Sequence, residues 1–144
     1  MWDRLLLAVE GSESGWAAVE FTATLAAETG AQVQVLHVKE LPANPRVLPM
    51  EGAEQAQEIV DQVVAYLDRE AITVDGRVVS MSEDRIANAI VAEASAQGCN
   101  AIVLGSRRLR GLGRLVGHGV RGKVLRLSSL PVITAPSPAE EKAS

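Results

Sequence analysis

The sequence predicts one α/β domain in which helices cover both faces of an open, five-stranded parallel sheet. Short, continuously apolar runs recur along the chain, as expected of strands that are covered on both faces. Segments with helical spacing of apolar residues separate these runs, so the order is β-α-β-α-β-α-β-α-β. The 144 residues suit a single domain that buries about two-thirds of its surface.

The first strand is expected at residues 4–9, RLLLAV, which end at the turn-like EGSES. A helix is expected over 15–30, with Ser12 or Ser14 as its N-cap and Gly30 at its C-terminal end. Its expected buried stripe consists of Ala17, Phe21, Leu25 and Ala26.

The second strand is expected at 32–38, QVQVLHV, before a proline-containing loop. The second helix is expected over about 51–70, the third strand around 77–80 and the third helix over about 85–97. The expected buried stripes are Ala56, Ile59, Val63 and Leu67 in the second helix, and Ile86, Ile90 and Ala94 in the third.

The last elements surround a glycine-rich segment. The fourth strand is expected at 100–105, a short helix over about 120–128, and the fifth strand at 131–136, PVITAP. We expect residues 1–136 to form the domain and residues 137–144 to be a disordered, charged tail.

The net charge of −4 hides an uneven distribution. Residues 1–104 carry 16 acidic and 6 basic residues, whereas residues 105–136 carry 7 basic residues and no acidic one. A cationic segment on an acidic body indicates either an anion site or a contact with an acidic protein partner. The alternative is that these arginines only form a solvated loop and helix face.

Several classes of function find no support in the composition. The single cysteine, Cys99, excludes an internal disulfide and a zinc site of several thiolates. No apolar stretch approaches the ~20 residues of a membrane span and no leader is recognisable, so we expect a cytoplasmic protein without membrane or nucleic-acid partners. We expect no metal site and no catalytic residue. His37 is expected to be a half-buried residue at a strand end, and Trp2 and Trp16 to be packing or dimer-contact residues.

The segment LGSRRLRGLGRLVGHGVRG contains two spacings that are found at phosphate-binding loops. The G-x-G-x-x-G at Gly117–Gly122 does not follow a strand directly, and no acidic residue lies about twenty positions later. The G-x-x-x-x-G-K that ends at Lys123 is followed by Val124, where a P-loop needs a hydroxyl for magnesium. Neither spacing therefore predicts a site.

A ligand crevice is expected where the carboxyl ends of the central strands diverge. If the first and fourth strands are neighbours, Ala8, Val9 and Glu10 lie on one side of this crevice and Gly105 on the other. The glycine-rich segment begins at that point.

Three blocks resemble the universal stress protein family: LLLAVEGSESGWAAVEFTATLAAETGAQVQVLHV, ANAIVAEASAQGCNAIVLGSR and KVLRLSSLPVITAP. The resemblance extends over residues 3–136. It implies the strand order 3-2-1-4-5 and a homodimer that forms through the last strand. The dimer contact would involve Val132, Ile133 and Thr134.

ATP-binding members of that family resemble G-x2-G-x9-G-[S/T] after the fourth strand. Laid on this chain without gaps, the four positions are Gly105, Arg108, His118 and Gly119, so that one of the four is kept. The aspartate that contacts adenine in the family corresponds to Glu10. A further position, which uses its backbone, corresponds to Val38. Val120, which follows Gly119, completes the expected nucleotide crevice.

The resemblance implies a homodimeric module in stress response and regulation, without the family's usual ATP binding and without turnover. The alternative is an adenine-nucleotide-binding protein that takes ATP or AMP, with Arg108 and His118 in contact with the phosphate. An interaction protein that docks an acidic partner through the arginines stays open as well. Slow ATP hydrolysis is disfavoured, because the phosphate cradle is degraded and no magnesium ligand is visible.

Overall fold

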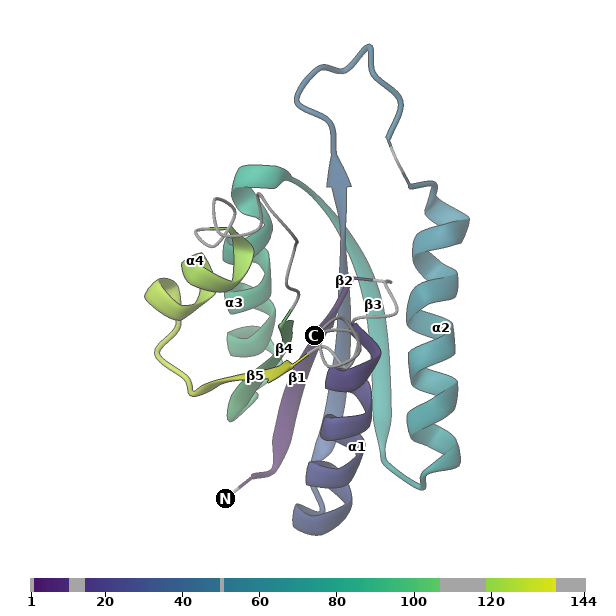
Figure 1. Cartoon of the computed structure of the whole chain (residues 1–144), viewed down its shortest axis with the longest axis vertical. Coiled ribbons are helices and arrows are strands. Elements are labelled where there is room, and N and C mark those ends of the chain that lie inside the picture. Colours follow the sequence, from purple (N-terminus) through teal and green to yellow (C-terminus); the bar gives the residue numbers. More distant parts are fainter. Residues whose placement is uncertain (1, 11–14, 50, 107–118, 137–144) are drawn as a thin grey trace, which may run out of the picture.

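The computed structural model describes residues 2–10, 15–49, 51–106 and 119–136. They form one five-stranded sheet of order β3-β2-β1-β4-β5 (Figure 1), in which all neighbouring strands are parallel. The predicted fold class and strand order are confirmed. The strands are β1 (Arg4–Val9), β2 (Gln32–Leu41), β3 (Val74–Ser82), β4 (Ala101–Ser106) and β5 (Val132–Pro136).

Helices cover both faces of the sheet. One face packs against α1 and α2, and the other against α3 and α4, as the two separate apolar clusters show. The helices are α1 (Trp16–Thr29), α2 (Ala53–Arg69), α3 (Ile86–Ala96) and α4 (Val120–Leu127), and a short 3-10 helix, η2 (Glu83–Arg85), precedes α3.

The central position of β1 in the sheet explains why its sequence is continuously apolar. Leu5 and Leu7 point into the cluster under α1 and α2, whereas Leu6 points into the cluster under α3 and α4. All three side chains are fully buried. A strand that is covered on both faces cannot alternate between apolar and polar residues, because each side chain meets a helix layer.

The predicted buried stripe of α1 is wrong for three of its four residues, and only Ala26 is buried as predicted. Phe21 is 41% exposed, and Ala17 and Leu25 are half-buried. The face on the sheet is instead made of small residues: Ala18, Val19, Thr22, Ala23 and Ala26. Small side chains bring the helix axis close to the strands, and the Thr22 hydroxyl is satisfied because it donates to the Ala18 carbonyl at 2.7 Å. In a helix that is apolar on most sides, spacing alone does not select this face.

The other helices follow their predictions more closely. In α2 the buried residues include three of the four predicted ones, and Val60 is buried where Ile59 was expected. In α3, Ile90 and Ala94 are buried as predicted, and Ile86 is half-buried. Gly30 ends α1 with φ 76°, as predicted, and its N–H donates to the Ala26 carbonyl at 2.8 Å. Ser12, Ser14 and the expected tail 137–144 lie outside the described residues.

The strands β2 and β3 are both longer than predicted. Their pairing continues from His37–Val78 to Leu41–Ser82, which is four residues beyond the last β1–β2 pair. Figure 1 shows β2 leading into the loop before α2, whereas the end of β3 leads toward α3. The apolar pattern ends at Lys39 because this part of β2 no longer lies in the core, although its backbone stays paired.

Candidate functional site

The carboxyl ends of β1, β2 and β4 lie next to one another, because these strands are parallel neighbours. The last register pair of β1 with β2 joins Val9 and His37, and the last pair with β4 joins Ala8 and Leu104. The structure thus brings the predicted strand-end positions to one edge of the sheet. The positions directly beyond these pairs are Glu10 after β1, Val38 on β2 and Gly105 on β4.

The side chains at this edge point alternately to the two faces. Ala8 and Val38 pack against the cluster under α3 and α4, and Val9 is buried in the cluster under α1 and α2. Glu10 is exposed. The edge therefore carries the Glu10 carboxylate at the end of β1.

Two glycines flank the edge on the sides of β4 and α4. A Cβ on Gly105 would lie 3.5 Å from the Cα of Gly15, which is ordinary contact with the start of α1. Gly119 precedes α4, and its carbonyl accepts the N–H of Lys123 at 3.1 Å. Val120, the first residue of α4, packs against the same cluster as Ala8. The start of α4 thus provides backbone groups and no hydroxyl.

The predicted phosphate contacts Arg108 and His118 lie outside the described residues, as do Arg107, Arg110 and Arg114. In the part of the cationic segment that the structure describes, Arg121, Lys123 and Arg126 lie on α4. Arg121 and Lys123 are half-buried and Arg126 is exposed. The described helix therefore carries positive charge from its first turn onwards.

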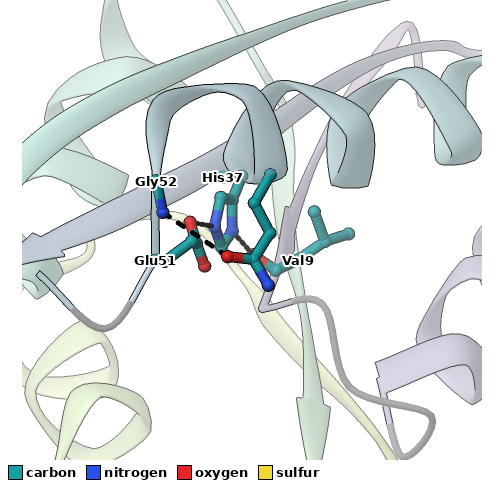
Figure 2. A network of polar contacts seen from close by, with 5 residues as sticks. Val9, His37, Glu51 and Gly52 are labelled. Atoms are coloured by element: carbon teal, nitrogen blue, oxygen red, sulfur yellow. Dashed lines mark hydrogen bonds and ion pairs between the residues drawn. The ribbon is translucent and has the colours of Figure 1, made fainter.

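His37 is the residue at this edge that reasoning from the sequence missed. Its side chain is 4% exposed, and both ring nitrogens are within hydrogen-bond distance of oxygens. Nδ1 lies 2.7 Å from the Val9 carbonyl oxygen, and Nε2 lies 2.6 Å from Oε1 of Glu51 (Figure 2). His37 thus connects the end of β1 with the residue that precedes Gly52, the N-cap of α2.

The expectation of a half-buried histidine at a strand end is corrected on both counts. His37 is fully enclosed, and β2 continues for four residues beyond it. Its apolar neighbours Leu36 and Val38 weakly indicated that His37 is buried. Nothing in the sequence marked Glu51 as its partner, because the two residues are 14 positions apart across an irregular loop.

A second polar region lies at the opposite end of the sheet. A hollow of about 280 Å³ is lined there by residues at the starts of β1, β2 and β3, among them Arg4, Gln32 and Asp75. Nearby, the buried Glu93 carboxylate lies 3.3 Å from Nε2 of Gln34 and 3.3 Å from Nε of Arg77. The polar groups of Gln34, Arg77 and Glu93 are therefore paired with one another.

Other singled-out residues serve packing. The rings of Trp16 and Tyr66 meet edge to face with centroids 5.3 Å apart, which joins α1 to α2. Trp2 packs against the same cluster. Among the described residues, no group of three potential metal ligands occurs, and no helix has the length and apolarity to cross a bilayer.

A model of the universal stress protein family matches residues 1–136. The chain belongs to the universal stress protein family. No curated protein matches it. Solved universal stress proteins share the fold at low sequence identity.

A universal stress protein from Burkholderia pseudomallei has 23% identity and a TM-score of 0.75, over 94% of this chain and 97% of that one. A universal stress protein in complex with cAMP has 21% identity and a TM-score of 0.72, over 94% and 98%. The protein from Archaeoglobus fulgidus in complex with dAMP has 23% identity and a TM-score of 0.70, over 93% and 98%.

Against the ATP motif that the family resemblance implies, a gap-free match keeps one of the four positions, Gly105. A glycine at 119 stands where the motif has a hydroxyl, and Arg108 and His118 stand where it has glycines. Glu10 stands in place of the aspartate, and is longer by one methylene. The nucleotide roles that the resemblance implies for these positions stay predictions, and two of the positions, Arg108 and His118, lie outside the described residues.

Proposed function

We propose that this universal stress protein is a homodimeric regulatory module that binds an adenine mononucleotide at the edge formed by β1, β2 and β4. The proposal assigns no turnover to it. The observation that carries the proposal is the convergence of Glu10, Val38 and Gly105 beyond the last register pairs of these strands. In open parallel sheets, ligands bind where the carboxyl ends of such strands meet.

The adenine end of the proposed site rests on groups that this edge retains. The Glu10 carboxylate is exposed and accepts hydrogen bonds, as the exocyclic amine of adenine requires. Ala8 and Val38 are apolar and half-buried, which suits contact with a flat base. Two universal stress proteins with this fold are solved in complex with cAMP and dAMP.

The phosphate end favours a monophosphate over ATP. The family's glycine cradle lets several backbone N–H groups approach a triphosphate, and here Arg108 and His118 occupy two of its positions. Single cationic side chains suit one phosphate, which a guanidinium grips through two hydrogen bonds. We therefore expect AMP or cAMP to bind more tightly than ATP.

Titration of AMP, cAMP and ATP into the purified protein, followed by calorimetry and by thermal unfolding, tests this proposal. A nucleotide at 100 times its dissociation constant should stabilise the protein by about 2.7 kcal/mol. The absence of heat and of a melting shift with all three nucleotides would overturn nucleotide binding. A higher affinity for ATP than for AMP would instead show that the usual mode persists.

Two sets of variants localise the site. Glu10→Ala should weaken AMP binding by about 2- to 10-fold, the range of one hydrogen bond. Glu20→Ala removes an exposed acid from α1 and should leave the affinity unchanged. The triple change Arg108→Gly, His118→Gly and Gly119→Ser restores three motif positions and should raise the affinity for ATP. An unchanged ATP affinity would mean that these departures are not what weakens ATP binding.

A second candidate function rests on the uneven charge. Seven basic and no acidic residues over 105–136 suit docking of an acidic protein surface. Reversal of charge at Arg107, Arg108 and Arg110 should then abolish an association that weakens with salt. An association profile that does not change in the reversed variant would contradict this function.

A further inference from the structure

The nucleotide proposal makes no use of the His37–Glu51 pair, although His37 contacts Val9, the residue that precedes Glu10 of the proposed site. His37 is buried between β1 and the start of α2, with Val9 opposite it on β1 and Val78 opposite it on β3. Its contacts therefore join three separately placed parts of the backbone (Figure 2): the end of β1, the middle of β2 and the entry to α2.

The two contacts determine how many hydrogens the His37 ring must carry. The Val9 carbonyl oxygen accepts hydrogen bonds only, so Nδ1 must carry a hydrogen at 2.7 Å from it. An ionised Glu51 carboxylate also only accepts, so Nε2 must carry a hydrogen at 2.6 Å. With Glu51 ionised, both contacts exist together when His37 is the imidazolium cation.

We propose that His37 and Glu51 form a proton-dependent clasp that holds the loop before α2 against the carboxyl end of β1. Loss of the imidazolium proton leaves a lone pair on Nε2 that faces the Glu51 carboxylate. The two groups then repel each other, and the contact with Glu51 opens while the contact of Nδ1 with Val9 remains. The clasp is closed on the acidic side of the transition and open on the basic side.

Charged residues of both signs lie on the elements around the pair. The cationic ones include Lys39 of β2, Arg46 in the loop before α2 and Arg77 of β3. β3 presents the uncharged Val78 opposite His37. The acidic groups are Glu10 after β1, Glu20 on α1, and Glu51 and Glu54 at the start of α2.

The clasp has a consequence for the proposed nucleotide site, and this consequence rests on the proposed function. Val9 directly precedes Glu10, so the hydrogen bond from His37 fixes the backbone that carries the Glu10 carboxylate. His37 and Glu51 are thus positioning residues, which act through Val9 and through the loop. When the clasp opens, the His37 ring keeps its hydrogen bond to Val9 but loses its anchor at the entry to α2. The ring then holds the end of β1 less firmly, and we expect AMP to bind more weakly.

Hydrogen exchange of the backbone amides in residues 43–51 tests the clasp without any nucleotide. Exchange is compared at about pH 5.5 and about pH 8.5, on either side of the ordinary histidine titration, after correction for intrinsic rates. We expect protection to fall by about tenfold at the higher pH, the effect of one hydrogen bond to a charged group. Protection in the wild-type protein that does not depend on pH would overturn the proposal.

Two variants with the same charge change provide the matched comparison. In Glu51→Gln the amide accepts from a protonated Nε2 and donates to a deprotonated one, so protection should become independent of pH. Glu54→Gln changes an exposed acid in the first turn of α2 and should keep the wild-type dependence. The same pH dependence in Glu51→Gln as in Glu54→Gln would contradict the clasp.

A spectroscopic measurement on the wild-type protein does not depend on the folding of any variant. Nitrogen-15 NMR of the His37 ring should show both nitrogens protonated at the lower pH and only Nδ1 protonated at the higher pH. A neutral ring throughout this range would overturn the proposal. AMP titration at both pH values separates the nucleotide proposal from the clasp. If AMP binds at neither pH, the nucleotide proposal is refuted, and the hydrogen-exchange test of the clasp is unaffected.

Discussion

Gly76 on β3 lies where α2 packs directly on the sheet. A Cβ at this position would lie 2.6 Å from Cγ1 of Val60 and 2.9 Å from Cγ2 of Val64, both on α2. We expect Gly76→Ala to lower the free energy of unfolding by about 1–3 kcal/mol, because the helix must move away from the strand. Denaturation with urea measures this. Gly105→Ala is the control, since its Cβ meets only an ordinary contact at 3.5 Å, and equal losses in both variants would contradict this account.

Cys99 is buried, and burial raises the pKa of its thiol to about 11. The folded protein therefore holds the proton at a pH where the unfolded chain, with a thiol pKa near 9.0, has lost it. It follows that Cys99 lowers stability as the pH rises from about 9 to about 11. We expect a smaller loss of unfolding free energy over this range in Cys99→Ala than in the wild-type protein, and an equal loss would contradict the burial effect.

At the scale of the element, α1 shows which of its faces supports the sheet. Val19 is 1% exposed and Phe21 is 41% exposed, although Phe21 is the larger apolar residue. We expect Val19→Ala to cost about 1–3 kcal/mol of unfolding free energy, and Phe21→Gln to cost clearly less. Thermal and chemical unfolding of the two variants show which one loses more unfolding free energy. A larger loss for Phe21→Gln would mean that Phe21 is covered in solution, for example by a second copy.

At the scale of the whole molecule, β5 is an edge strand of the sheet. The proposed homodimer would pair this edge with its copy, through Val132, Ile133 and Thr134. Pro131 precedes the strand and Pro136 is its last residue. Thr134 is exposed, so Thr134→Asp should leave the fold intact. It would place like charges near the two-fold axis, which destabilises the pairing.

Sedimentation velocity at micromolar concentration measures this effect. We expect a dimer for the wild-type protein and a shift to monomer for Thr134→Asp. Ser129→Asp adds the same charge to an exposed turn before β5 and should remain dimeric. A monomeric wild-type protein, or a dimer that tolerates Thr134→Asp, would contradict pairing through β5.

The part of the fold that was predictable depends on local pattern. The run RLLLAV at 4–9 matches β1 residue for residue, because a strand that is buried on both faces requires uninterrupted apolar residues. The extension of β2 to Leu41 and the sheet-facing side of α1 were not predictable in this way. The extension is stabilised by backbone pairing with β3, and the face of α1 by the fit of small residues, and neither depends on hydrophobic spacing.

The sequence by itself determined the order of elements, the parallel sheet and the strand ends that carry Glu10 and Gly105, because these follow from residue types at short spacing. The tertiary structure decided the role of His37. Its two partners lie 28 and 14 positions away, and one of them is a backbone carbonyl, which every residue type provides. A contact of this kind leaves no trace in the sequence, because it exists only when the end of β1 and the entry to α2 are folded against β2.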